Sequence, residues 1–151
     1  MAKEIERKYL VNESEWRKLI NKVPHTSYGI TQGYLFDIGN HIGRIRHTSY
    51  GEFIFTYKGP TKGIERTEHE FQLWKWVGKL ALKLCSKKLV KTRTLVGPWE
   101  VDEFHNLNQS LILAEIELSD SSASFTEPKW IGREVSYDSE YFNSNLVKKV
   151  V

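Results

Sequence analysis

The chain has 151 residues, 40% of them hydrophobic and 27% charged, which is the composition of one ordinary globular domain. Its formal net charge of +3 is spread along the whole chain, without the basic block of a nucleic-acid-binding tail. The single cysteine, Cys85, excludes an internal disulfide, and no apolar run has the length of a membrane span or the pattern of a signal peptide.

We therefore expect residues 1–151 to form one domain, located in the cytoplasm, with neither a nucleic acid nor a membrane as partner. Cys85 lies in an apolar helical run, where a buried structural thiol is a more common role than a nucleophile. The weakly positive charge by itself says little about ligands.

Eight segments carry strand signals and four carry helix signals. In chain order, the predicted strands cover about 3–11, 31–36, 42–49, 52–58, 64–71, 88–96, 98–104 and 111–118. The predicted helices run from Asn12 or Ser14 to about Lys22, over 72–84, near 121–126, and from about Asp138 to Lys149. Within 72–84 the apolar residues recur with the period of an amphipathic helix; they are Leu73, Trp76, Val77, Leu80, Ala81 and Leu84.

The predicted fold is mainly β, within the α+β class. Short connections favour antiparallel hairpins, and eight antiparallel strands are enough to close a barrel. We expect the helices to pack on the outside of this barrel through their apolar faces.

Charged residues recur at every second position on several of these strands. Glu4, Glu6 and Lys8 share one strand face, and so do Arg44 and Arg46. A sheet with its polar side in water explains any single segment. It explains the whole set less well, because like charges side by side on one strand repel each other. The pattern therefore predicts a charged interior in which acids and bases alternate around a water-filled, metal-filled or anion-filled space.

The residue types of this interior suit metal-assisted phosphoryl chemistry. Carboxylates at Glu4, Glu6, Glu115 and Glu117 are hard ligands of the kind that Mg²⁺ or Mn²⁺ accepts. Phosphate contacts are offered by Lys8, Arg44, Arg46, Lys58, Arg66, Lys91 and Arg93.

An ordered series of motifs carries a family resemblance. It consists of the E-x-E-x-K run of Glu4, Glu6 and Lys8, followed by residues 32–35, 44–46, 56–58, 66–70, 91–93, 99–102, 114–117 and 130–135. This series resembles the CYTH superfamily, also called triphosphate tunnel metalloenzymes, along nearly the entire chain. The resemblance implies an eight-stranded antiparallel barrel whose tunnel holds a triphosphate and a divalent metal.

The resemblance also implies roles for individual residues. Glu4, Glu6 and Glu117 would bind the activating metal with Glu115 nearby, and phosphate oxygens would be held by Lys8, Arg44, Arg46, Lys58, Lys91 and Arg93. Lys91 and Tyr34 match a tunnel Lys–Tyr pair that positions the attacking water in small bacterial-type tripolyphosphatases. Secondary acidic candidates for a second metal, for water or for pairing with the bases are Glu68, Glu70, Glu100, Asp102 and Glu134.

Members of the family differ in their reactions. The Lys–Tyr match and the compact size favour hydrolysis of inorganic tripolyphosphate to diphosphate and phosphate, with activity rising on the alkaline side if Lys91 is the base. The alternatives are a thiamine triphosphatase, a nucleoside triphosphatase, a less favoured adenylyl cyclase, and a non-catalytic polyphosphate-binding module. One departure is Glu140, where relatives often carry a base before the tyrosine near the C-terminal helix.

Overall fold

The computed structural model describes residues 2–151, with side chains from residue 5 onward. Within this range the chain forms nine strands, of which β2 extends furthest beyond its sequence signal. They are β1 (Ala2–Val11), β2 (Thr26–Ile38), β3 (His41–Thr48), β4 (Phe53–Lys62), β5 (Glu65–Leu73), β6 (Lys88–Val96), β7 (Trp99–Phe104), β8 (Leu111–Glu117) and β9 (Ile131–Glu134).

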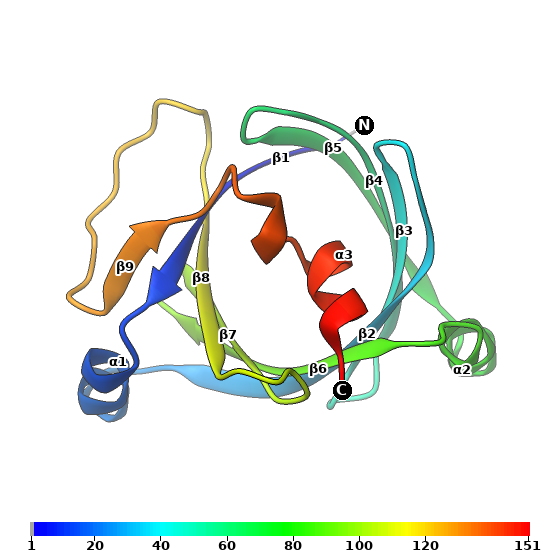
Figure 1. Cartoon of the computed structure of the whole chain (residues 1–151), viewed down its shortest axis with the longest axis horizontal. Helices are drawn as coiled ribbons and strands as arrows, with labels where there is room; N and C mark the ends of the chain where they lie inside the picture. Colours follow the sequence, from blue (N-terminus) through cyan, green and yellow to red (C-terminus); the bar gives the residue numbers. More distant parts are fainter. Residues whose placement is uncertain (1) are drawn as a thin grey trace.

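Strands β1 to β8 close a barrel, which confirms the predicted fold class. The sheet order is β5-β4-β3-β2-β6-β7-β8-β1, all neighbours are antiparallel, and the start of β1 pairs with β5 to join the two edges. Figure 1 shows these strands as a ring, with the C-terminal part of the chain in front of it. Strand β9, which the sequence analysis does not predict, pairs with the far end of β1 through Tyr9 and Val11.

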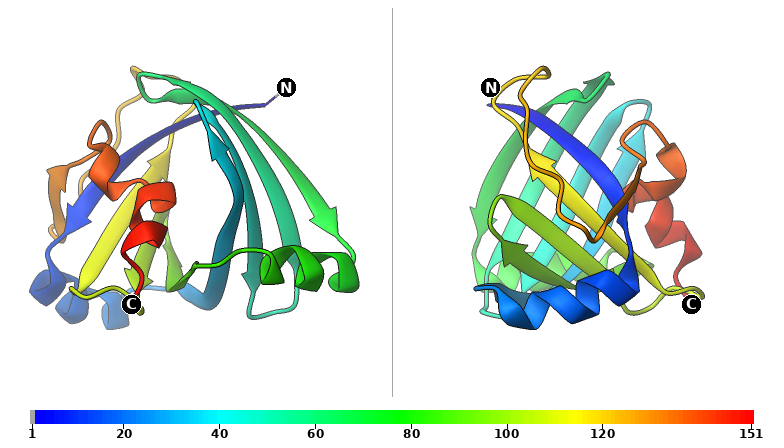
Figure 2. Two further views of the ribbon diagram at one scale, coloured as in Figure 1. Left: turned by 45° about the vertical axis from the view of Figure 1, so that its right-hand side comes forward. Right: turned by 90° about the vertical axis from the view of Figure 1, so that its left-hand side faces the viewer.

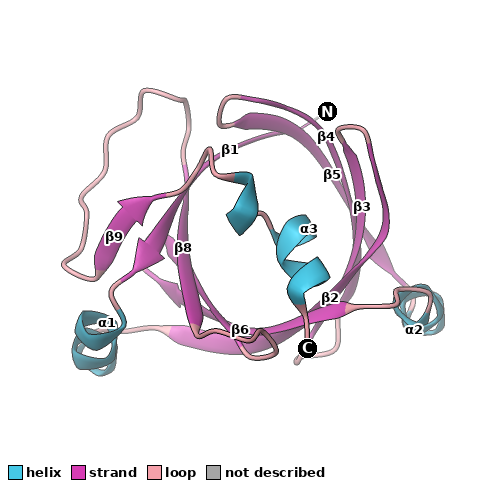
Figure 3. Cartoon of the chain, in the orientation of Figure 1, coloured by secondary structure: helices cyan, strands magenta, loops and turns pink. Residues whose placement is uncertain are grey.

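The helices are short (Figure 3). Two lie beside the barrel, and the C-terminal ones lie in front of the ring of strands. They are α1 (Glu13–Leu19) with the 3₁₀ turn η1 (Ile20–Lys22), α2 (Lys75–Lys83), η2 (Ser139–Tyr141), α3 (Asn143–Leu146) and η3 (Val147–Lys149). The side chain of Asn12 caps α1 by accepting a hydrogen bond from the Glu15 N–H, as predicted. Within the described residues no helix is both long enough and apolar enough to cross a membrane.

The helix predicted near 121–126 is wrong. Residues 118–130 form a loop between β8 and β9, because the Asp120 side chain accepts a hydrogen bond from the Ser122 N–H and stabilises a turn there. The single helix predicted at the C-terminus is instead divided into η2, α3 and η3.

Two apolar clusters stabilise this arrangement. The larger one lies between β1, β7, β8, α1 and the 118–130 loop, and its buried aromatic residues are Tyr9, Trp16, Trp99 and Trp130. The second cluster contains Leu89, Phe104 and Leu113 together with Leu146 and Val147 of the C-terminal segment, which we define as residues 139–151. The turned views of Figure 2 show this segment, in orange and red, along the side of the barrel that faces the viewer in Figure 1.

Candidate active site

The residues of four neighbouring strands form layers inside the barrel. On β1, Glu6 and Lys8 are followed two positions later by Leu10, and β7 has the same order of charged and then apolar residues. On β6 and β8, which run antiparallel to these strands, the order is reversed, so residues of one kind still lie side by side. Since side chains two apart share a strand face, the charged residues form one layer and the apolar residues the next. The apolar layer packs against the C-terminal segment and consists of Leu10, Leu89, Phe104 and Leu113.

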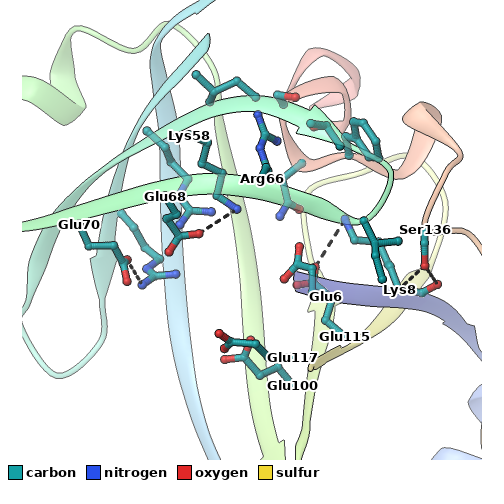
Figure 4. Close-up of a pocket in the computed structure, with 18 of the residues that line it drawn as sticks. Glu6, Lys8, Lys58, Arg66, Glu68, Glu70, Glu100, Glu115, Glu117 and Ser136 are labelled. Carbon is teal, nitrogen blue, oxygen red and sulfur yellow. Dashed lines mark hydrogen bonds and ion pairs between the residues drawn. The ribbon is translucent and has the colours of Figure 1, made fainter. Parts of the chain in front are cut away.

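Carboxylates gather in the charged layer where β1, β7 and β8 meet. Glu6 lies opposite Glu117 in the β1–β8 ladder, and Glu115 lies opposite Glu100 in the β7–β8 ladder. The Glu6 carboxyl group also lies close to that of Glu115. Figure 4 shows the four side chains directed into one region, and we call them the carboxylate cluster: Glu6, Glu100, Glu115 and Glu117.

Two cations border this cluster. Lys8 Nζ lies 3.5 Å from Glu115 Oε1, and Arg93 Nη1 lies 3.3 Å from Glu100 Oε2. Burial by itself raises the pKa of Glu115, but Lys8 and Arg93, together with the Glu6 side chain, hold the pKa below its ordinary value. Burial raises the pKa of Glu100, and Arg93 opposes this only in part. Further positive charge would therefore stabilise the carboxylate cluster.

The other side of the interior is basic. We call the residues of β3, β4 and β5 that form it the basic wall: Arg44, Arg46, Lys58 and Arg66. Arg44 is only 6% exposed and donates from Nη2 to Thr56 Oγ1 at 3.3 Å. Among the described residues, the buried Nε atoms of Arg44 and Arg46 have no hydrogen-bond partner. Burial, together with repulsion from Arg44 and Arg93, lowers the pKa of Arg46.

Such a pair of arginines favours an anionic ligand. An oxyanion between Arg44 and Arg46 would accept hydrogen bonds from both Nε donors and reduce the repulsion between the guanidinium groups. Within the basic wall, Lys58 Nζ lies 3.6 Å from Glu68 Oε2, and Arg46 Nη2 lies 3.4 Å from Glu70 Oε2.

A cavity of about 210 Å³ joins the two sides. Its lining contains six basic residues, Lys8, Arg44, Arg46, Lys58, Arg66 and Arg93, and six carboxylates, Glu6, Glu68, Glu70, Glu100, Glu115 and Glu117. Acids and bases thus meet across one enclosed space, which is the arrangement that the alternating strand pattern predicts.

Asp102 lies behind the cavity and binds two cations. Its carboxylate accepts hydrogen bonds from Lys91 Nζ at 2.7 Å and from Arg93 Nε and Nη2 at 2.8 and 2.9 Å. Burial alone raises the pKa of Asp102, but Lys91 and Arg93 outweigh it and hold the pKa well below the usual range. Burial lowers the pKa of Lys91 to about 8; Arg93 acts in the same direction, and Asp102 opposes both.

The C-terminal segment supplies the remaining part of the lining. Phe142, Asn143 and Ser144 border the cavity, and Lys8 Nζ donates to the Tyr141 carbonyl at 3.1 Å. The sequence analysis misses these residues, because nothing in their spacing shows that they reach the barrel interior. The only signal is the apolar Leu146–Val147 pair, which needs a buried partner surface.

Comparison with known proteins decides the family. The family model of the CYTH domain matches residues 2–150 of the chain. The chain belongs to the CYTH domain family.

Similar proteins cover almost the whole of this CYTH domain. A curated protein of Acetivibrio thermocellus named inorganic triphosphatase is 38% identical over 154 residues, covering 98% of this chain and 95% of that protein. The crystal structure of the inorganic triphosphatase NE1496 has a TM-score of 0.65 and 26% identity, and the match covers 97% of this chain and 95% of the other. A putative adenylyl cyclase from Hippeastrum, described as having a dominant triphosphatase activity, has a TM-score of 0.62 at 12% identity over 80% of each chain, and shows the fold alone.

In this CYTH domain, Lys91 and Tyr34 are not brought together. Lys91 pairs with Ile30 on β2, and Tyr34 is four residues further along that strand, about 13 Å away in the strand direction. Lys91 contacts Asp102, whereas Tyr34 lines the cavity and its hydroxyl accepts a hydrogen bond from Gln32 Nε2 at 3.1 Å.

Two acidic candidates are not among the described residues that line the cavity. Glu134 is on β9 and pairs with Arg7, whose Nε donates to Glu134 Oε2 at 2.9 Å. Arg7 occupies the strand face opposite to that of Glu6 and Lys8, so Glu134 does not line the cavity. The backbone of Glu4 pairs with Arg66, but its side chain lies outside the described residues.

The carboxylate cluster fits a hard divalent cation by its chemistry. Glu6 and Glu117 are directly opposed like charges, which are destabilising unless a proton or cation lies between them. A divalent cation among these carboxylates would relieve their repulsion, and hard oxygen ligands are those that such a cation prefers. Among the described side chains no three potential ligands already converge as a complete metal site, and Glu4, the further ligand expected from the sequence, is not among them.

Proposed function

We propose that this chain is a triphosphatase that uses Mg²⁺ or Mn²⁺ to hydrolyse inorganic tripolyphosphate to diphosphate and phosphate. One observation carries the proposal: two arginines with unpartnered buried Nε donors line a cavity whose other side is a carboxylate cluster. This combination needs a polyanion and a cation together. The names of the Acetivibrio relative and of NE1496, both inorganic triphosphatases, support the same reaction.

The basic wall would hold the substrate. Arg44 and Arg46 donate to its phosphate oxygens, while Lys58, Lys8 and Arg93 add positive charge around the cavity. These side chains are held by ion pairs and buried contacts before substrate arrives, so they fix the phosphate chain and stabilise the charge of the transition state. A cation bound by Glu4, Glu6 and Glu117, with Glu115 nearby, would withdraw charge from the phosphate oxygens.

Lys91 would act through Asp102 and Arg93 rather than by direct contact with substrate. Its ammonium group is bound to Asp102, which also fixes the Arg93 guanidinium toward the cavity. We therefore assign Lys91 a positioning role, and we assign Tyr34 a direct contact with substrate or attacking water, because Tyr34 lines the cavity.

A substrate panel tests the proposed function. Phosphate release is measured from tripolyphosphate, ATP and thiamine triphosphate, each with Mg²⁺, with Mn²⁺ and with EDTA. We expect release that is fastest from tripolyphosphate and lost in EDTA. Tight binding of tripolyphosphate without release would instead indicate a binding module, and faster turnover of ATP or thiamine triphosphate would overturn the assigned substrate.

The arginine pair gives a prediction on substrate affinity. Replacing Arg44 by Gln removes a buried charge whose Nε has no protein partner, so we expect kcat/KM for tripolyphosphate to fall about 10- to 100-fold, as for one charged hydrogen bond. Steady-state kinetics measures this effect, and Arg133→Gln, at an exposed position on β9, is the matched control. Equal effects of the two substitutions would contradict the role of Arg44.

The lowered pKa of Lys91 gives a prediction on pH. Above about pH 8 Lys91 loses its proton, so Asp102 is balanced by Arg93 alone and the cavity becomes less positive. We expect KM for tripolyphosphate to rise through this pH, and we expect the rise to be absent in Lys91→Met. A kcat that increases through pH 8 and loses this increase in Lys91→Met would show that Lys91 is a base instead.

A further inference from the structure

The apolar face of α2 that the sequence analysis expects to cover the barrel points outward instead. Three large apolar residues that the helical pattern assigns to the barrel-covering face are exposed: Trp76 by 66%, Leu80 by 56% and Leu84 by 73%. They follow one another at intervals of four, so they form one row along the helix surface. A second row on the same side contains the exposed lysines Lys75, Lys79 and Lys83.

Close contacts with the barrel fix the rotation of α2. Gly78 lies so close to Phe53 that a Cβ atom at Gly78 would be 2.3 Å from the Phe53 ring. At the end of the helix, Cys85 is buried against Gly33, where a Cβ would be 2.5 Å from the Cys85 Cβ. Only small residues permit this approach, so turning the Trp76 row inward would force bulky side chains into the barrel wall.

The charged side chains of this surface are all positive. Residues 74–90 contain the lysines 75, 79, 83, 87 and 88 and no aspartate or glutamate. Within the part of the chain that the structure describes, no ion pair is found for Lys75, Lys79 or Lys83. The patch is continued by Trp74, exposed by 75%, at the start of the helix. We call it the α2 patch: Trp74, Lys75, Trp76, Lys79, Leu80, Lys83 and Leu84.

We propose that the α2 patch binds the surface of an anionic lipid bilayer. A row of bulky apolar side chains beside a row of lysines is the arrangement by which helices lie in the plane of a bilayer interface. The apolar row would enter the headgroup boundary, where tryptophan is favoured, and the lysines would contact lipid phosphates. Figure 1 shows α2 at the edge of the molecule, well separated from the C-terminal segment that borders the cavity.

A second copy of the chain fits this surface less well. A twofold contact would place the same patch on both subunits, so lysines would face lysines without any carboxylate from this segment to compensate. This proposal differs from the sequence-based expectation of no membrane partner, and surface association needs no spanning helix.

Sedimentation with lipid vesicles tests this proposal on the full chain. Vesicles of phosphatidylcholine alone are compared with vesicles containing about a third phosphatidylserine, at low and at high salt. We expect binding to the anionic vesicles that weakens at high salt. It should fall on the order of 100-fold in Lys75→Gln/Lys79→Gln/Lys83→Gln, and by a similar factor in Trp76→Ser/Leu80→Ser.

Matched controls are placed on other faces of the protein. They are Ile38→Ser, which is 72% exposed, and Lys18→Gln/Lys22→Gln/Lys129→Gln, and both should bind vesicles like wild type. Thermal unfolding and phosphate release check that every variant is folded. The proposal is overturned if wild type does not bind anionic vesicles, if Trp76→Ser/Leu80→Ser binds them normally, or if light scattering shows that the patch instead mediates a dimer.

Discussion

Replacing Glu6 or Glu117 by Gln should abolish most of the metal-dependent activity while leaving the fold intact. Each substitution keeps the side-chain size but removes a negative oxygen donor from the carboxylate cluster. Because a bound cation contributes several kcal/mol of transition-state stabilisation, we expect kcat/KM to fall by about 100-fold or more. Phosphate release from tripolyphosphate, titrated with Mn²⁺, measures the loss and should show a weaker apparent metal affinity.

Measurements of stability distinguish a loss of metal binding from unfolding of the variant. Glu6 and Glu117 repel each other across the β1–β8 ladder, so in EDTA either Gln variant should unfold at the same temperature as wild type or at a higher one. The matched control is Glu127→Gln, an exposed carboxylate in the 118–130 loop, which should change neither property. If Glu6→Gln and Glu117→Gln both retain wild-type turnover, the proposed metal site is wrong.

The barrel could be predicted because its signal is local. Period-two charges identify strand faces from the sequence alone, and short connections limit the strands to antiparallel hairpins. Eight strands and a charged interior follow from these two features, and the structure shows the interior residues around one cavity. Glu6, Arg44 and Lys58, for example, come from three separate strands and line the same space.

The remaining features depend on tertiary contacts that leave little trace in the sequence. Strand β9 has only four residues, and two of them, Gly132 and Arg133, carry no strand signal. The orientation of α2 depends on Gly78, because a helix approaches a sheet most closely at a small residue, not at its largest apolar row. The resemblance pairs Lys91 with Tyr34, but the register of β2 with β6 separates them, and the pairing of β6 with β7 brings Asp102 beside Lys91.

The Asp102 ion pairs should have the largest effect on stability. In Asp102→Asn, the buried cations Lys91 and Arg93 lose their shared counter-charge, so we expect a loss of about 3–5 kcal/mol in the free energy of unfolding. Urea denaturation measures it, and the exposed Asp37→Asn is the control. Lys91→Met should be far less harmful, because burial already disfavours the ammonium form, and Lys91→Met/Asp102→Asn should regain part of the loss.

The pH dependence of this loss identifies its source. The pKa of Asp102 is lower in the folded state than the ordinary value of about 4, so the folded state binds fewer protons than the unfolded state in acid. The stabilisation is therefore complete above about pH 5 and is lost as the pH falls toward the lower folded pKa. The difference between wild type and Asp102→Asn should shrink accordingly below pH 4. A difference that stays constant down to pH 3 would mean that packing or hydrogen bonding, rather than charge, holds Lys91 and Arg93 in place.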